Sequence, residues 1–235
     1  MGKLLKSQLN YFSKNEKRLW SFSVLLILGS FLIFDRENYL TLAASLIGVT
    51  SLIYDAKGNP FGQVLMIVFS LLYGMISYTF AYYGEMATYL GMTAPMSAFA
   101  LVSWLKNPYQ GNKSEVEINS LSGKEISLMA LLTAAVTVLF YFILDAFHTA
   151  NLLPSTLSVT TSFMAVYLTY KRSAFFALAY AANDVVLIVL WALAALSNPS
   201  YLSVLTCFAV FFFNDAYTFI NWTRMQKRQK AAALN

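Results

Sequence analysis

Two Asn–Asp pairs stand inside long apolar stretches, and they are the residues of this chain best placed for chemistry. Asn183-Asp184 lies within the apolar run 173–196, and Asn214-Asp215 lies within the run 201–222. An ionisable side chain in such a run is costly unless it faces a cavity or a partner. The two pairs are therefore candidate substrate-binding residues. The alternative is that they bond across helices and hold a helical bundle together.

Aromatic residues recur at helical spacing around these polar side chains. Tyr180, Asp184 and Trp191 share one face of a helix over residues 173–196, and Asn214 and Tyr217 share a face of the next. If these faces meet, they form a cavity with an aromatic wall beside amide and carboxyl groups. Such a cavity suits a flat polar solute, including a cationic one. The same cavity is expected to include Tyr73 from an earlier run.

The composition predicts a polytopic membrane protein. Of the 235 residues, 58% are hydrophobic and 11% are charged, whereas soluble domains carry about 25% charged residues. One cysteine, Cys207, and one histidine, His148, argue against a disulfide framework and against a metal centre. We therefore expect no metal and no cofactor. The net charge of +5 comes from Lys and Arg between the apolar runs, so it indicates membrane topology and not nucleic-acid binding.

Eight apolar runs are candidate transmembrane helices: residues 19–34, 39–54, 60–83, 86–105, 126–148, 152–170, 173–196 and 201–222. With eight spans, 15 of the 16 Lys and Arg residues fall on one face and Arg36 on the other. Cytoplasmic segments collect Lys and Arg, so both termini are predicted to be cytoplasmic. The alternative of seven spans, with the first run only interfacial, would place the basic N-terminal tail outside. The first run ends without a small-residue cleavage site, which favours a retained helix over a signal peptide.

An offset of 118 residues superimposes the second to fourth runs on the sixth to eighth. It aligns Tyr73 with Trp191 and Trp104 with Trp222, the latter two being expected as interfacial anchors beside Lys106 and Arg224. Because the fifth run reverses the chain once more, the two triplets would be parallel. The predicted fold is an all-α polytopic membrane protein in which two three-helix repeats are joined by a linker helix (3+1+3) behind an extra N-terminal helix. The segments are 1–38 (tail and extra span), 39–105 (first repeat), 106–148 (loop and linker helix), 149–222 (second repeat) and 223–235 (basic tail).

Five short motifs carry a resemblance to a known family: Asp-Ala-Lys-Gly-Asn-Pro at 55–60, Leu-Tyr-Gly at 72–74, Tyr-Tyr-Gly-Glu at 82–85, Trp-Leu-Lys-Asn-Pro-Tyr at 104–109, and Asn183-Asp184. Over residues 47–224 the chain resembles the PnuC family of bacterial vitamin B3 transporters. The resemblance implies a SWEET-like fold, a homotrimer in the bacterial cytoplasmic (inner) membrane, and facilitated, uncoupled uptake of nicotinamide riboside for NAD biosynthesis, with intracellular phosphorylation trapping the substrate. Asn183 and Asn214 match family Asn positions. Ala179 and Phe69 depart from the family pattern, where a Trp and an Asn are usual.

The motifs of other functional classes are absent from the sequence, although some alternatives stay open. An enzyme is not expected, because the sequence contains neither a G-x-S-x-G nor an H-E-x-x-H motif. The segment Gly-Asn-Lys-Ser at 111–114 is not a Walker A motif, so an ATP-driven pump is not expected either. The alternatives are a proton-coupled carrier, a facilitator of another vitamin or riboside such as thiamine, and a structural or receptor-like membrane protein.

Overall fold

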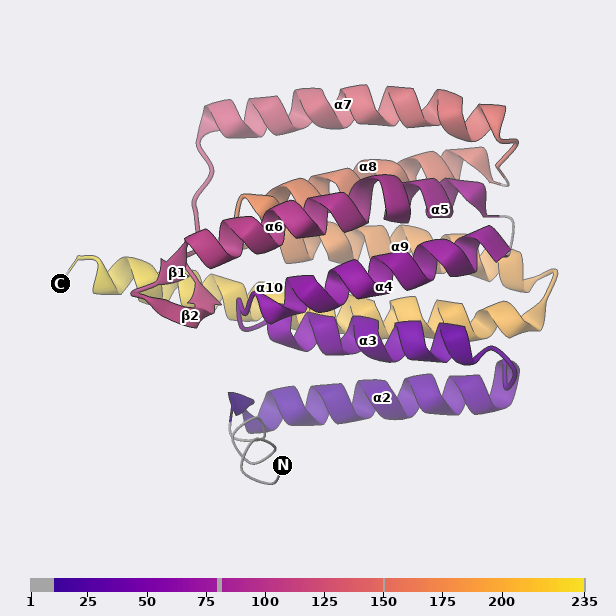
Figure 1. The fold of residues 1–235 in the computed structure, drawn as a ribbon, viewed down its shortest axis with the longest axis horizontal. Coiled ribbons are helices and arrows are strands. Elements are labelled where there is room, and N and C mark those ends of the chain that lie inside the picture. The colour runs from indigo at the N-terminus through magenta and orange to yellow at the C-terminus, as the bar shows by residue number, and fades with distance from the viewer. Residues whose placement is uncertain (1–10, 80–81, 150, 235) are drawn as a thin grey trace.

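Apolar helices make up nearly all of the part of the chain that the structure describes (Figure 1). The structure is a computed structural model that describes residues 11–79, 82–149 and 151–234. Lys3 and Lys6 of the predicted cytoplasmic tail lie outside these residues. The longer helices are α2 (Lys14–Phe34), α3 (Tyr39–Asp55), α4 (Phe61–Thr79), α7 (Gly123–Ala146), α8 (Leu152–Tyr170), α9 (Phe176–Ala195) and α10 (Leu202–Ala232).

Between α4 and α7 the chain forms a composite helix and a small hairpin. The segments α5 (Tyr83–Thr88), η1 (Tyr89–Thr93) and α6 (Ala94–Lys106) follow one another without a break, and β1 (Pro108–Tyr109) pairs antiparallel with β2 (Asn112–Val116). A 3-10 turn, η2 (Pro199–Tyr201), precedes α10. By length and composition, six helices of the described residues could cross a membrane: α2, α4, α7, α8, α9, and η2 with α10. The apolar α3 is shorter, at 17 residues.

Capping boxes fix where two of these helices begin. At the start of α2, Ser13 accepts a hydrogen bond from the Glu16 N–H while the Glu16 carboxyl accepts one from the Ser13 N–H. Ser122 and Glu125 make the same reciprocal pair at the start of α7. Each box satisfies backbone donors that a helix start leaves free. The first apolar run is therefore extended to Lys14 in the structure.

The helical segment that leads into α6 contains a π-helical turn just before Pro95. Pro95 stands in the first turn of α6, directly after η1. Proline has no N–H, so the carbonyl one turn earlier loses its α-helical donor, and a π-turn accommodates such an interruption within a continuing helix. The wider turn places Tyr89 and Thr93 against the centre of the bundle.

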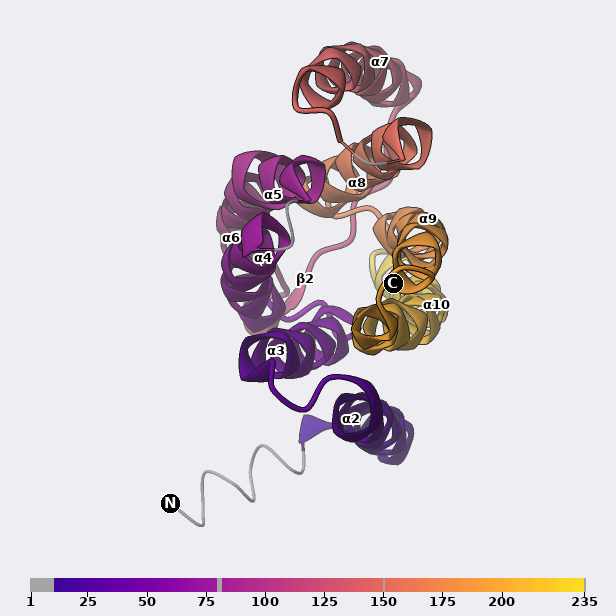
Figure 2. The ribbon, with the colours of Figure 1, turned by 90° about the vertical axis from the view of Figure 1, so that its right-hand side faces the viewer.

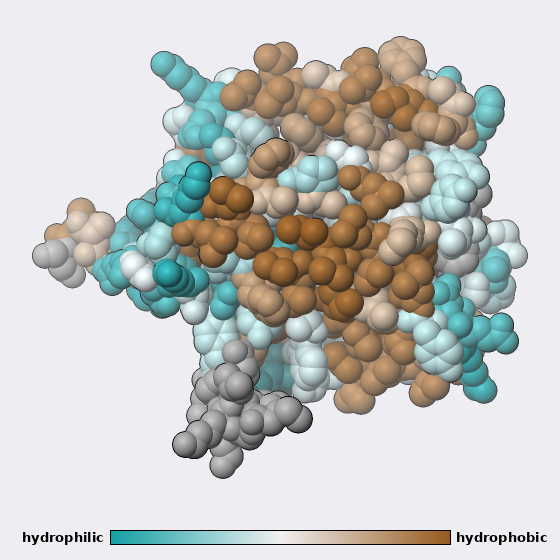
Figure 3. Space-filling model, in the orientation of Figure 1, coloured by the Kyte–Doolittle hydropathy of each residue, from teal (hydrophilic) through white to brown (hydrophobic). Residues whose placement is uncertain are grey.

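Two groups of helices face each other, with α2 and α7 at opposite edges. In Figure 2, α4, α5 and α6 lie on one side and α9 and α10 on the other. Only 6% of the apolar stretch of α7 is buried, and large apolar side chains such as Leu131 and Phe142 are exposed on it. On the face drawn in Figure 3, apolar residues cover the middle of the molecule, and polar residues gather at the end with the hairpin and the C-terminal part of α10. An exposed apolar band is the surface expected of a protein in lipid.

The two aligned tryptophans meet inside the bundle, near the hairpin end. The ring centroids of Trp104 and Trp222 are 5.3 Å apart, and both side chains are 0% exposed. Trp104 Nε1 donates to the Thr169 carbonyl at 2.9 Å, and Trp222 Nε1 donates to the Asp55 carbonyl at 2.7 Å. The expectation that both are interfacial anchors is therefore wrong. Each indole N–H finds its acceptor at the end of a neighbouring helix, which makes deep burial of the ring possible.

The residue before each tryptophan also binds a backbone carbonyl, the one that follows the carbonyl bound by the tryptophan. Ser103 Oγ donates to the Tyr170 carbonyl at 2.9 Å, and Asn221 Nδ2 donates to the Ala56 carbonyl at 2.6 Å. Two consecutive side chains near the end of α6 thus bind two consecutive carbonyls at the end of α8, and two on α10 bind two at the end of α3. Ser103 and Asn221 are themselves related by the 118-residue offset.

Candidate functional site

A small cavity lies near the middle of the bundle. Its volume is about 20 Å³, which is room for about one water molecule. Most of its polar groups come from α8 and α9, whereas the side of α3, α4 and η1 is mainly apolar and aromatic. The lining residues are Leu52, Met66, Phe69, Tyr89, Thr93, Ser162, Tyr180, Asn183, Asp184, Phe208, Phe211 and Asp215. Tyr180, Asn183, Asp184 and Asp215, four of the predicted site residues, therefore share one cavity.

Asp184 of α9 and Asp215 of α10 meet in this cavity. Their side chains are 3% and 2% exposed, both line the same cavity, and their carboxyl groups lie next to each other. Among the described residues, no side chain or backbone group donates a hydrogen bond to Asp184 Oδ2 or to Asp215 Oδ1. The ion pairs among the described residues involve neither carboxyl group. The pair is consequently the most polar feature of the cavity.

Asn183 is held from the opposite side by hydroxyl groups of α8. Its Oδ1 atom accepts hydrogen bonds from Thr161 Oγ1 at 2.8 Å, Ser162 Oγ at 3.0 Å and Ser158 Oγ at 3.5 Å. An amide oxygen has two lone pairs, so these donors saturate it. The side-chain N–H groups of Asn183 are therefore the ones that can bind a solute, and the hydrogen bonds from α8 fix their orientation.

Tyr73 and Trp191 lie in an aromatic cluster beside the cavity and are not among its lining residues. Their ring centroids are 6.3 Å apart. Tyr73 packs on Tyr89 at 4.5 Å, and Trp191 packs on Tyr82 at 4.9 Å and on Tyr201 at 5.5 Å. Because Tyr82 and Tyr201 lie at the ends of helices opposite the hairpin, this cluster separates the cavity from that face of the protein.

Asn214 and Tyr217 contact α2 and do not line the cavity. Asn214 Nδ2 donates to Ser23 Oγ at 3.0 Å, and Tyr217 OH donates to Glu16 Oε1 at 3.4 Å. The two residues share a helix face, as their spacing predicts, but that face packs on the extra N-terminal helix. Asp215 is one position further along, about 100° around the helix, and this rotation carries it into the cavity.

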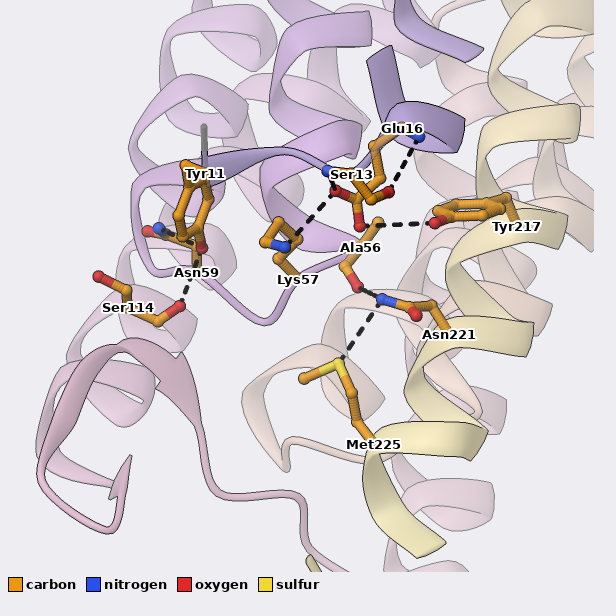
Figure 4. Close-up of polar contacts among 10 residues, drawn as sticks. All are labelled: Tyr11, Ser13, Glu16, Ala56, Lys57, Asn59, Ser114, Tyr217, Asn221 and Met225. Atoms are coloured by element: carbon orange, nitrogen blue, oxygen red, sulfur yellow. Dashed lines mark hydrogen bonds and ion pairs between the residues drawn. The ribbon is translucent and has the colours of Figure 1, made fainter. Parts of the chain in front are cut away.

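A second, polar cavity of about 270 Å³ opens at the hairpin end of the bundle. In Figure 4, Glu16 forms an ion pair with Lys57, in which Nζ and Oε2 are 3.5 Å apart. Glu16 also accepts a hydrogen bond from Tyr217 OH. Tyr11 donates to the Ser114 carbonyl at 3.1 Å, and burial raises the pKa of its phenol. This cavity combines charges of both signs, because Glu115 and Arg228 also line it and pair with each other.

Sequence reasoning missed the apolar and aromatic part of the central cavity. Phe208 and Phe211 precede Asp215 by seven and four positions and share its helix face, so helical spacing alone could have found them. Met66 and Phe69 gave no comparable signal, because an apolar residue in an apolar run has no distinguishing neighbour. The residues of the polar cavity at the hairpin end, such as Glu16, were missed because they come from segments far apart in the sequence.

An apolar bundle that encloses a carboxyl pair, an amide and several aromatic faces halfway along its helices has the construction of a membrane transport protein. The comparisons identify the family. The family model described as nicotinamide mononucleotide transporter matches residues 38–224, and the chain belongs to this family. The resemblance to PnuC noted in the sequence is thereby confirmed, and the family is one of transporters, not enzymes.

Two related proteins support this assignment. The chain is 26% identical over 214 residues to the nicotinamide riboside transporter PnuC of Neisseria mucosa, covering 89% of this chain and 81% of the relative. It is also similar to the crystal structure of the vitamin B3 transporter PnuC, with a TM-score of 0.81 and 23% identity over 93% of this chain and 94% of the other. At that identity the structural match establishes the fold.

Proposed function

We propose that this protein transports nicotinamide riboside across a bacterial cytoplasmic membrane. The family membership and the related riboside transporter support this substrate. The observation that carries the proposal is the lining of the central cavity, which combines aromatic faces with Asn183 and a carboxyl pair. Aromatic faces suit the pyridine ring, and the amide N–H groups suit the ribose hydroxyls or the carboxamide oxygen.

The same lining favours the riboside over its phosphate ester, the mononucleotide named by the family model. A phosphate monoester carries about 1.5 to 2 negative charges near neutral pH and is usually bound by Arg or Lys. The described lining of the central cavity includes no Lys or Arg and does include Asp184 and Asp215. A phosphate group there would face like charge without a cationic partner.

We propose Tyr180, Asn183, Asp184 and Asp215 as substrate contacts, with Tyr73 and Trp191 as the aromatic layer that closes the cavity on one side. Asn214 and Tyr217 then have a structural role, because they join α10 to α2. Transport is uncoupled in this proposal: the riboside moves down its own gradient and phosphorylation inside the cell removes it. Proton coupling is the alternative.

We further propose the eight-span, 3+1+3 architecture with both termini in the cytoplasm. Its support is the reciprocal contact of Trp104 and Trp222 with the ends of α8 and α3, which is the symmetry expected of two parallel repeats. We also propose the trimer that the resemblance implies, with the exposed face of α7 available for contact.

Topology is tested by single cysteines in a Cys207→Ala background. On intact cells, an impermeant thiol reagent should label a cysteine at Asn198, which is exposed beyond the end of α9, and should not label one at Lys113 in the hairpin. The control for reactivity is that both positions are labelled once the cells are permeabilised. Labelling at Lys113 from outside would contradict the orientation.

The substrate is tested by equilibrium binding of radiolabelled nicotinamide riboside to the purified full-length protein. Unlabelled riboside should displace the label, while nicotinamide mononucleotide should compete at least about tenfold more weakly. Thiamine belongs in the same competition series. Absence of binding, or tighter binding of thiamine or of the mononucleotide, would overturn the proposed substrate.

A further inference from the structure

Buried carboxyl groups outnumber their cationic partners in the described bundle. Glu16 is buried and pairs with Lys57 at the hairpin end. The other ion pairs of the described residues join surface positions in the loops and helix ends. Four further carboxyl groups, each only 2–3% exposed, therefore have no described cation beside them: Asp55, Glu85, Asp184 and Asp215.

Asp184 and Asp215 differ from the other two because they touch each other and line the cavity. Two carboxylates in contact inside a buried cavity cannot both keep their charge, so the pair holds one proton. The pair with one shared proton presents a single negative charge to the cavity.

The groups around this pair do not neutralise that charge. The titratable side chains that face it are acids or neutral donors: Asp55 at the end of α3, Tyr89 on η1, Tyr180 on α9 and Cys207 on α10. The elements α4 and α8 contribute Met66, Phe69 and Ser162 to the lining, which carry no charge. A buried charge without a partner is costly in a membrane protein and marks a place where a positive group is bound or passes.

The remaining walls of the cavity are those that accept an organic cation. Tyr180 and Tyr89 line it together with the rings of Phe69, Phe208 and Phe211. The face of an aromatic ring attracts a cation, and the attraction grows when both are removed from water. Aromatic walls around one negative charge are therefore complementary to a flat ring with a permanent positive charge.

We propose that the Asp184–Asp215 carboxyl pair is the counter-ion of the substrate's charged ring, and that through it the cavity selects cationic rings over neutral rings of the same shape. This rests on the proposed function, because the pyridine ring of nicotinamide riboside carries a permanent positive charge. The counter-ion adds to the proposed function a reason for substrate selectivity, namely the positive charge of the ring. Either carboxyl group alone can hold the single charge when its neighbour is neutral.

The test compares nicotinamide riboside with its reduced dihydropyridine form, which has nearly the same shape and no ring charge. Binding of both ligands to the purified full-length protein is measured by displacement of the radiolabelled riboside and by calorimetry. The wild type should bind the charged form at least about tenfold more tightly than the reduced form. Equal binding of the two forms by the wild type overturns the counter-ion while leaving the proposed substrate intact. Binding of neither form overturns both.

Variants of the two aspartates test whether the carboxyl pair carries the negative charge that selects the cationic ring. Asp184→Asn and Asp215→Asn should each keep the preference to within about threefold of wild type, because one carboxyl group remains. The double variant should lose it and bind both forms alike. Glu85→Gln, which removes a buried carboxyl group outside the cavity lining, is the matched control and should keep the wild-type ratio. Loss of the preference in one single variant, or its persistence in the double variant, contradicts a shared charge. If the double variant does not fold, the wild-type ratio and the single variants still decide.

Discussion

The hairpin end of the bundle and the central cavity use the two proposed repeats, residues 39–105 and 149–222, in opposite ways. At the hairpin end the repeats act alike, because Trp104 and Trp222 each bind a carbonyl at the end of the other repeat's first helix. In the cavity they act differently. The first repeat contributes mainly apolar and aromatic side chains, while the second contributes Ser162, Asn183 and both members of the carboxyl pair.

The symmetric tryptophan contacts hold the helices together, whereas the asymmetric lining of the central cavity is the part proposed to bind a solute. A symmetric contact stabilises both repeats equally and carries no information about the substrate. A charged ring, by contrast, has one face and one set of substituents, so a site for it gains from unlike walls. The 118-residue offset makes the asymmetry visible in the sequence, since it places Met66 opposite Asp184 and Ser97 opposite Asp215.

The largest effect is expected from breaking the symmetric contact. Trp104→Ala and Trp222→Ala each remove a fully buried indole and should lower the free energy of unfolding by about 3–5 kcal/mol. The two losses should be similar if the repeats are equivalent here. Thermal unfolding of the purified variants in detergent measures this, with Trp20→Ala, at a 38% exposed position, as the matched control. A much smaller loss in one variant than in the other would contradict the equivalence.

Asn183 tests the asymmetric side of the comparison. Asn183→Ala removes the amide that Thr161, Ser162 and Ser158 orient. Truncating one partner of a buried hydrogen bond costs about 1–3 kcal/mol, so riboside affinity should fall by about 5- to 150-fold. The binding assay on monodisperse protein checks this. Unchanged affinity would mean that Asn183 only joins α9 to α8.

Asn214 should behave differently from Asn183 although both are buried. Asn214→Ala removes the contact with Ser23 of α2 and should lower the free energy of unfolding by about 1–3 kcal/mol. Its riboside affinity should stay within about threefold of wild type. Thermal unfolding and binding are measured on the same preparation. A tenfold loss of affinity with normal stability would place Asn214 in the binding site.

The smallest effect is expected at the ion pair of the polar cavity. Lys57 Nζ lies 3.5 Å from Glu16 Oε2, and the lysine side chain is 23% exposed. Partly exposed pairs contribute about 0–1 kcal/mol, and Ser13 and Tyr217 still contact Glu16 when Lys57 is replaced. Lys57→Met should therefore leave riboside affinity unchanged and shift thermal unfolding little. A large loss of stability would show that Glu16 depends on this cation.

Much of the fold follows from the sequence, because apolar length and capping residues are local. The start of α7 is marked by Ser122 and Glu125, and the interruption before Pro95 follows from the missing N–H. The 118-residue offset aligns Trp104 with Trp222, but it did not predict that the two rings meet. Their complete burial was not predicted, because the carbonyls that they bind belong to helices far away in the chain.

The site was predictable in its residue types and less so in its geometry. Asp184 and Asp215 stand out because carboxyl groups are rare in apolar runs. Which face of α10 lines the cavity was not predictable, since it depends on how α2 packs against Asn214 and Tyr217. Phe69 stands out in the sequence only as a departure from a family pattern, although it forms part of the cavity wall.

The central claim, that this chain transports nicotinamide riboside unaided, is tested most directly by uptake into proteoliposomes that contain only the purified protein. Labelled riboside should enter these vesicles, and not empty ones, without any imposed proton or sodium gradient, and its uptake should stop at equal concentrations inside and outside. Double replacement of Asp184 and Asp215 by Asn should slow this uptake. No uptake above empty vesicles would contradict the substrate, and accumulation beyond equilibrium that requires a proton or sodium gradient would contradict uncoupled transport.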